Sequence, residues 1–263
     1  MRIALGLEYD GAAFCGWQTQ PGGCGVQDHL QKALGYFADH PIEVTAAGRT
    51  DAGVHATAQV VHFETEVARD EASWVRGPNT YLDARVRVLW ARGVGAEFHA
   101  RYGATARTYH YLLMNEPVAP ALLHGRVGWF HRPLDADAMA REARTLVGEH
   151  DFSSFRDAQC QAKSPVRHMR EAQVERRGNL IVFRFTANAF LHHMIRNVVG
   201  ALVYVGCGRS PEGWIGELMS LRDRRAAAPT FMADGLYLTR VEYDAKFNLP
   251  AFRAPVLPGF VAT

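Results

Sequence analysis

The chain has 263 residues, of which 48% are hydrophobic and 21% charged, the balance of an ordinary globular protein rather than of a disordered or fibrous one. The formal net charge of +2 excludes no binding partner, although most of the 29 basic residues are arginines, whose planar guanidinium groups suit phosphates and base edges. No window approaches the roughly 20 apolar residues of a membrane span, and the N-terminus lacks the apolar core of a signal peptide. We therefore expect a cytoplasmic protein with no membrane partner, whose four cysteines are reduced.

The first half of the chain alternates between strand and helix patterns. Ile3, Leu5 and Leu7 recur at a period of two, which predicts a strand. Asp70 is a candidate helix cap, although Gly77–Pro78 weakens the later part of the helix that would follow it. The predicted elements are strands Arg2–Tyr9, Ile42–Ala47, Ala58–Glu66 and Arg85–Trp90, and helices Val26–Ala38 and Glu71–Leu82.

The second half has a similar rhythm. An Asp cap and a following glycine frame one helix, and Arg177–Asn179 reads as the turn of a hairpin. The predicted elements are strands Thr105–Met114, Val166–Arg176, Leu180–Ala187 and Leu236–Tyr243, and helices Asp135–Val147 and Phe190–Val205.

This order predicts the fold class. Each half runs strand, helix, two strands, helix, strand, the order of a ferredoxin-like unit, and such runs favour α+β with antiparallel sheets. We expect two ferredoxin-like (RRM-like) halves, residues 1–104 and 105–263, joined around a central basic cleft. The first half would carry the catalytic loop, and the second would complete the active site.

The loop Gly48–Thr57, between two predicted strands, has the residue types of a reactive site. Its glycines allow close approach of a ligand, and Arg49 and Asp51 stand two residues apart. An accessible carboxylate beside a cation can act as a nucleophile or general base. An ordinary turn that contains an Asp is the alternative. A P-loop or dinucleotide loop is excluded, since the required glycine and lysine spacing is missing.

The segment Ala47–Ala56, AGRTDAGVHA, resembles the signature of the tRNA pseudouridine synthase A family. Further blocks agree in family order and cover nearly the whole chain. They are Tyr9–Gly11 with Phe14 and Gly16–Gln18, Phe98–Arg101, Arg107–Tyr111, His150–Phe152, Phe190–Asn197, Ala228–Pro229 and Gly235–Leu238. Family pattern is weakest at Pro117–Gly125 and Ser210–Pro229, which leaves the outer tRNA-binding surface open.

The resemblance implies an isomerase without cofactor or metal. It would convert uridine to pseudouridine at positions 38, 39 and 40 in the anticodon arm of tRNA, with Asp51 as the catalytic carboxylate and the target base flipped out. The carboxylate could attack the sugar C1′, attack uracil C6, or remove the 2′ proton to give a glycal; the residues do not choose among these routes. The resemblance also implies a homodimer.

The remaining site residues come from the same resemblance. Tyr109 would stack on the target base, with a half-buried sheet tyrosine as the alternative. Arg196 would pair with Asp51 and lower its pKa. Arg49 would hold the flipped base or contact a phosphate, and Leu236 or Leu238 would line the uracil pocket.

Two other functions, RNA binding alone and metal-dependent nuclease activity, fit these residues less well. A purely RNA-binding protein has no use for a carboxylate near phosphates, and a metal-dependent nuclease needs a ligand cluster that the sequence does not assemble. Adjacent His192 and His193 on a helix would point about 100° apart, so we expect no metal site there. The scattered cysteines, which lack a CxxC pair, likewise predict no structural zinc site.

Overall fold

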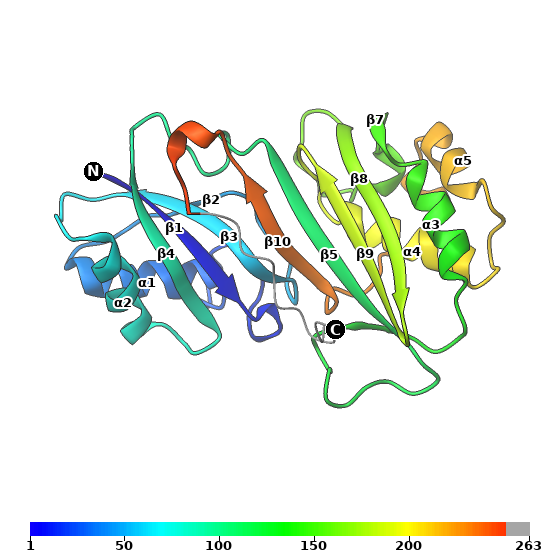
Figure 1. Cartoon of the computed structure of the whole chain (residues 1–263), viewed down its shortest axis with the longest axis horizontal. Coiled ribbons are helices and arrows are strands. Elements are labelled where there is room, and N and C mark those ends of the chain that lie inside the picture. The colour runs from blue at the N-terminus through cyan, green and yellow to red at the C-terminus, as the bar shows by residue number, and fades with distance from the viewer. Residues whose placement is uncertain (251–263) are drawn as a thin grey trace. The chain divides into compact units, whose positions relative to one another are not determined.

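A computed structural model describes residues 1–250 of the chain, so residues 251–263 of the predicted C-terminal half lie outside the described residues. The chain forms two compact units (Figure 1). Unit 1 comprises Met1–Arg107 and the described residues from Tyr237 onward, and unit 2 comprises Thr108–Leu236. The chain thus leaves unit 1 near the start of β5 (Ala106–Asn115) and returns to it at the start of β10 (Leu236–Glu242).

Unit 1 combines a sheet with two helices. Its strands follow the order β4-β1-β3-β10, with β2 also paired to β3. Neighbouring strands are antiparallel except for β3 and β10, which are parallel. The elements before the crossing are β1 (Arg2–Tyr9), α1 (Val26–Ala38), β2 (Thr45–Ala46), β3 (His55–Glu64), α2 (Glu71–Tyr81) and β4 (Val86–Val94).

Both faces of the unit 1 sheet are covered, which explains why β1 is buried along most of its length. On one face Phe63 of β3 meets the edge of Trp74 in α2, at a ring-centroid distance of 5.1 Å. On the other face Ala4 belongs to a cluster around Phe98, against which Tyr243 and Phe247 pack. Alternate side chains of β1 therefore pack into two apolar layers, one on each face of the sheet, and neither face of the strand is open to solvent along most of its length.

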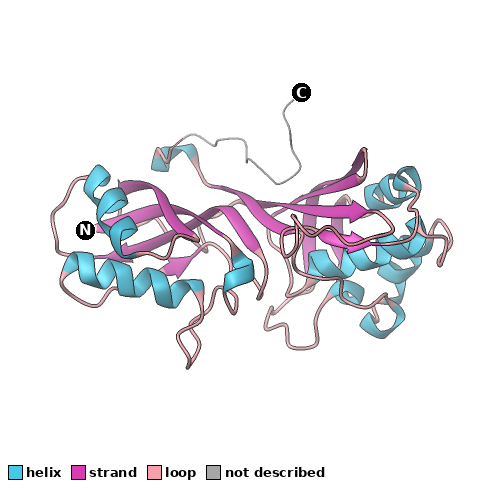
Figure 2. Ribbon diagram, turned by 90° about the horizontal axis from the view of Figure 1, so that it is seen from below, coloured by secondary structure: helices cyan, strands magenta, loops and turns pink. Residues whose placement is uncertain are grey.

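Unit 2 combines further strands of the sheet with three helices (Figure 2, in which all helices are cyan). The strand order is β5-β9-β8-β7, and β6 runs parallel to β5. The β7–β8 and β8–β9 pairs are antiparallel. The elements are β6 (Gly128–Phe130), α3 (Ala136–Arg144), β7 (Gly148–Asp151), β8 (Val166–Arg177), β9 (Leu180–Ala187), α4 (Met194–Gly206) and α5 (Trp214–Leu221).

The predicted α+β class is confirmed, because both units combine helices with mostly antiparallel strands. No helix within residues 1–250 is long and apolar enough to cross a membrane. The doubtful helix extends through Gly77–Pro78 to Tyr81, with Asp70 accepting a hydrogen bond from Ser73 N–H as its cap. A glycine is needed at position 77 because a Cβ there would collide with the ring of Phe37.

Several boundaries differ from the predicted ones. Strand β3 begins at His55, inside the predicted loop, because residues 55 and 56 pair with β10, a partner distant in sequence. Helix α3 ends at Arg144, and Gly148, at φ +118°, then starts the unpredicted strand β7. Helix α4 begins at Met194 rather than at Phe190, and α5 was not predicted at all.

The expectation of four reduced cysteines is wrong for Cys15 and Cys24, which form a disulfide. The segment between them folds back, so that Cys15 N–H donates to Cys24 O at 3.0 Å and the two Cα atoms lie 5.4 Å apart, a separation that suits a disulfide. Cys160 and Cys207 are free. The sequence spacing of Cys15 and Cys24 does not predict the turn that brings them together.

Candidate active site

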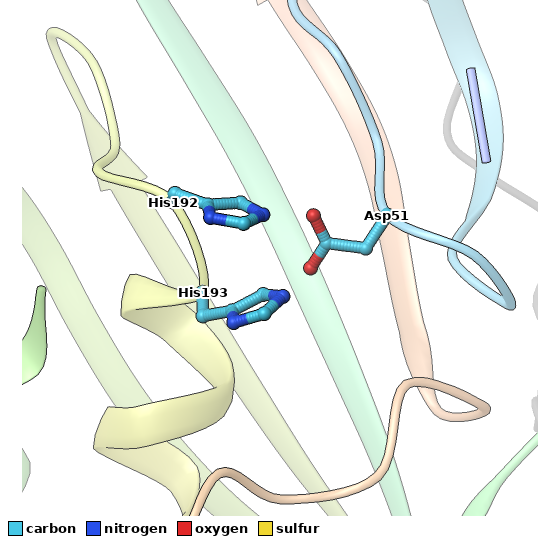
Figure 3. Close-up of side chains that lie close together, drawn as sticks. All are labelled: Asp51, His192 and His193. Carbon is cyan, nitrogen blue, oxygen red and sulfur yellow. The ribbon is translucent and has the colours of Figure 1, made fainter. Parts of the chain in front are cut away.

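Asp51 lies on the loop that links β2 to β3, and Figure 3 shows its side chain on that loop. The carboxylate-bearing residue is partly exposed, whereas Thr50 before it is buried. A tight turn follows, in which Val54 N–H donates to Asp51 O at 3.1 Å and Gly53 adopts φ +80°. Because L-residues rarely adopt that angle, a glycine is required here. The turn displays Asp51 while its neighbours anchor the loop.

A buried hydrogen-bond network holds the loop from the side of the sheet. The Tyr9 hydroxyl lies 2.9 Å from Thr50 Oγ1. Gln59 Nε2 donates to the Tyr9 hydroxyl at 3.3 Å and to Gly48 O at 2.7 Å. Burial raises the pKa of Tyr9 to about 12, although the hydrogen bonds with Thr50 and Gln59 act in the opposite direction. The phenol therefore stays protonated at neutral pH.

The segment after Cys15 holds the loop from another direction. Trp17 N–H donates to Thr50 O at 2.9 Å. Gly16, at φ +91°, lies so close to the loop that a Cβ would come within 2.9 Å of Thr50 O and 3.0 Å of Ala52 N. Gly16 O and Trp17 O in turn accept hydrogen bonds from the first turn of α1. The donors are Val26 N–H and Gln27 N–H, respectively. Thr50 is therefore fixed by its side chain and by its carbonyl.

His55 joins the end of the loop to the end of β1. It is buried, its Nδ1 accepts from Gly11 N–H at 3.0 Å, and the same nitrogen lies 3.1 Å from Asp10 Oδ1. Its ring stacks on Tyr237 of β10, with a centroid separation of 4.5 Å. The histidine of the signature segment is thus a structural connection within unit 1.

The two cationic residues near the loop differ in exposure. Arg49 is exposed, as a residue that contacts RNA phosphates or bases must be. Arg107 is partly buried and donates to three backbone carbonyls, those of Ala47, Arg101 and Ala104. Arg107 therefore braces the start of the loop.

The other candidate residues belong to unit 2. Tyr109 on β5 is 9% exposed, and its ring meets the edge of Phe190 at a centroid distance of 5.2 Å. Arg196 on α4 donates from Nε to Phe231 O at 2.8 Å, which fixes the base of its guanidinium. Leu236 is buried at the start of β10. Arg49 and Asp51 thus share one loop of unit 1, whereas these three residues lie in unit 2.

His192 and His193 are not on the helix where they were predicted. His193 is the N-cap of α4 and has left-handed backbone angles, with φ 59°. The two rings therefore stack at a centroid distance of 3.9 Å instead of diverging, an arrangement visible in Figure 3. Both approach the Asp157 carboxylate, at 2.8 Å for His193 Nδ1 and 3.4 Å for His192 Nδ1.

Asp157 is a charged centre that sequence reasoning missed. Burial acts to raise the pKa of this carboxyl, but hydrogen bonds from Gln159 N–H and His193, with the charges of both histidines, more than offset it, so that the pKa lies below its usual value. An ionised carboxylate can orient both imidazoles. The only signal available beforehand was the polarity of the segment, which is common in loops.

The chemistry open to the Asp51 loop follows from this anchoring. Asp51 has the exposure that a nucleophile or base needs, and its neighbours are held in place by buried donors and acceptors. A carboxylate held in this way suits attack on a sugar carbon or on an unsaturated ring, or removal of a proton.

Comparisons with known proteins agree with this chemistry. A family model described as tRNA pseudouridine synthase matches residues 7–103 and 143–244. The chain is similar to proteins called tRNA pseudouridine synthase A from Aromatoleum aromaticum (60% identical, covering 95% of each chain), Methylobacillus flagellatus (57%, covering 95% of this chain and 96% of the relative) and Burkholderia ambifaria (56%, covering 98% and 96%). A solved Cbf5–Nop10–Gar1 complex matches with a TM-score of 0.37 and 13% identity, covering 90% of this chain and 48% of that one, too weakly to support an argument.

Proposed function

The chain belongs to the tRNA pseudouridine synthase family, and from this premise we propose that Asp51 is the catalytic carboxylate with which it isomerises uridines 38, 39 and 40 of the tRNA anticodon arm. That the chain is an isomerase converting uridine in tRNA to pseudouridine follows from the family itself. The position of the target and the identity of the catalytic residue are the proposed parts.

The reaction is a rearrangement of one nucleotide. The C1′–N1 bond breaks, the uracil rotates, C5 bonds to C1′, and the C5 proton leaves while N1 gains one. Atoms and electrons balance within the substrate and water. A carboxylate is sufficient for each of the three routes: attack on C1′, attack on C6, or removal of the 2′ proton. We accordingly propose that the enzyme needs no cofactor or metal.

The single observation that carries the assignment of Asp51 is its setting. It is a partly exposed carboxylate in a segment, Ala47–Ala56, whose flanking residues are immobilised by buried hydrogen bonds. Catalytic groups must be held within a fraction of an ångström, and misplacement by about 1 Å can cost about 100-fold in rate. A solvated turn would not require the Tyr9–Gln59 support.

We propose supporting roles for four further residues. Tyr109 would stack on the flipped uracil, and Arg196 would interact with Asp51 and the substrate. Arg49 would contact the RNA near the flipped nucleotide. Leu236 would form part of the apolar wall of the uracil site. The fixed Nε of Arg196 and the exposure of Arg49 support these roles.

We also propose that both halves, 1–104 and 105–263, are ferredoxin-like. In unit 1 the support is the chain order β1-α1-β2-β3-α2-β4 and the sheet order β4-β1-β3, with β2 beside β3. In the second half, β5, α3, β8, β9, α4 and β10 follow one another in the corresponding order. This is the split βαβ arrangement. A homodimer in the cytoplasm, acting on tRNA, completes the proposal.

Tritium release tests the catalytic role of Asp51. Bulk tRNA that carries uridine labelled with tritium at C5 loses the label to water when C5 bonds to C1′. We expect Asp51→Asn to lower the single-turnover rate about 1,000-fold or more, because the isosteric amide cannot act as nucleophile or base.

The matched control is Asp70→Asn, which also removes a carboxylate from unit 1 but leaves a side chain able to cap α2. It should release tritium at the wild-type rate. Release by Asp51→Asn at a comparable rate would reject Asp51 as the catalytic group.

A further inference from the structure

Tyr9, Thr50 and Gln59 form a buried polar cluster that takes no part in the bond-making and bond-breaking steps of the proposed reaction. Their exposed fractions are 4%, 6% and 0%. Burial of a hydroxyl or amide is unfavourable unless its hydrogen bonds are satisfied. An apolar residue at each position would therefore fill the same space with less risk to stability, which raises the question of what the cluster does.

The Tyr9 hydroxyl hydrogen-bonds to both other members of the cluster. The Gln59 Nε2 group can only donate, so Tyr9 Oη accepts from it at 3.3 Å. The other side-chain partner of Oη among the described residues is Thr50 Oγ1, at 2.9 Å. Either hydroxyl can donate in that pair. Because burial raises the pKa of Tyr9 to about 12, the phenol keeps its proton through neutral and mildly alkaline pH, and the hydrogen bond between the two hydroxyls persists.

The cluster touches the loop at two points that bracket Arg49. Gln59 Nε2 donates to Gly48 O at 2.7 Å, and Tyr9 reaches the side chain of Thr50. Gln59 lies on β3 and Tyr9 on β1, adjacent strands of one sheet. Gly48 and Thr50 are thus held in place by side chains of two paired strands rather than by other residues of the loop. Asp51 directly follows Thr50.

We propose that Tyr9 and Gln59, acting through Thr50, are positioning residues that set the orientation of the Asp51 carboxylate for the isomerisation. This inference rests on the proposed catalytic role of Asp51. Neither residue needs to touch the tRNA. Loss of the phenol hydroxyl should therefore slow the chemical step while leaving tRNA binding intact.

The test compares Tyr9→Phe with Tyr243→Phe. Tyr243 is a partly buried tyrosine of unit 1, and its hydroxyl donates to Ala100 O at 2.7 Å, so the control loses a similar bond away from Thr50. We expect Tyr9→Phe to lower kcat about 10- to 100-fold with KM for tRNA changed by less than about twofold. Tyr243→Phe should keep the wild-type kcat.

Substitutions at Thr50 provide a second measurement that does not depend on the folding of Tyr9→Phe. Thr50→Ser keeps the hydroxyl that hydrogen-bonds with Tyr9, whereas Thr50→Val removes it at nearly constant volume. We expect Thr50→Ser to retain kcat within about threefold and Thr50→Val to match Tyr9→Phe. The double variant should lose no more than either single one, because both break the same interaction.

Asp51→Asn, assayed alongside, distinguishes failure of the positioning role from failure of the proposed function. If Asp51→Asn is inactive while Tyr9→Phe and Thr50→Val turn over at the wild-type rate, the positioning role is overturned and the proposed function stands. An equal loss of kcat in Tyr9→Phe and Tyr243→Phe would overturn it as well, since the loss would then not depend on contact with Thr50. If Asp51→Asn is active, the proposed function itself fails.

Discussion

At the scale of single residues, two histidines of the described chain have strongly lowered pKa values. His62 is buried on β3 and its Nδ1 accepts from Ala100 N–H at 3.2 Å. Burial, with the nearby charges of His99 and Arg2, lowers the pKa of His62 to about 4. Burial likewise lowers the pKa of His110 to about 4, with help from Arg184 and Arg177. Both side chains are therefore neutral in the folded protein at neutral pH.

These lowered pKa values make the folded protein less stable in acid. Between about pH 6.5 and pH 4 the unfolded chain binds protons that the folded chain does not, so folding free energy is lost as the pH falls through that window. His62 should contribute a loss of at most about 3 kcal/mol. His62→Gln, which keeps a hydrogen-bond acceptor, should flatten the dependence. Urea unfolding at pH 7.5 and pH 4.5 measures it, and an unchanged pH dependence in His62→Gln would contradict this role of His62.

The sequence anticipates Asp51 better than the residues that hold it. Glycines around a carboxylate between two strands are a local pattern, legible within about ten residues. Tyr9 and Gln59 reach the loop across the β1–β3 pairing, and no local rule predicts a hydrogen bond between residues 41 positions apart, such as Tyr9 and Thr50. Alternation alone marks Tyr9 as an inward-facing strand residue and says nothing of its hydroxyl.

At the scale of elements, helix starts and loop closures account for most of the differences from prediction. The apolar spacing of Leu191 and Ile195 extends the predicted helix backward past its true start at Met194. His193 adopts left-handed angles, which permits the stacked pair that faces Asp157. The periodicity was right for the buried face of α4, but it carries no information about the backbone turn before it.

The Cys15–Cys24 disulfide gives a testable prediction at this scale. It closes a short loop, with a sequence separation of 9, for which chain-entropy arguments give about 2–3 kcal/mol of stabilisation. Protein isolated without reductant should show two titratable thiols when denatured, from Cys160 and Cys207, and four after treatment with dithiothreitol. Reduction should also lower Tm by several degrees.

The variant Cys15→Ser/Cys24→Ser should have the Tm of the reduced wild type, and its Tm should be the same with and without reductant. A Cys160→Ser/Cys207→Ser variant should keep the response of Tm to reductant. Four reactive thiols in protein never exposed to reductant would contradict the disulfide, and would fit a cytoplasm that keeps cysteines reduced.

At the scale of the whole molecule, the order of helices and strands along the chain was easier to predict than which strands pair in the sheet. Strand and helix periods identified most of the larger elements and the α+β class. The short elements β6, β7 and α5 were missed because segments of three to eight residues carry little periodic signal. The return of β10 to pair with β3 in unit 1 is a long-range contact, which hydrophobic patterning within a strand does not encode.

At this scale we propose that the chain makes pseudouridine at defined positions of the anticodon arm by means of one carboxylate. Unmodified tRNA transcripts with uridine at positions 38, 39 and 40 would be incubated with the purified protein in EDTA, and pseudouridine would be mapped by carbodiimide adducts that stop reverse transcription. We predict stops at those three positions with the wild type and none with Asp51→Asn. Absence of the stops with the wild type, or their persistence with Asp51→Asn, would contradict the account.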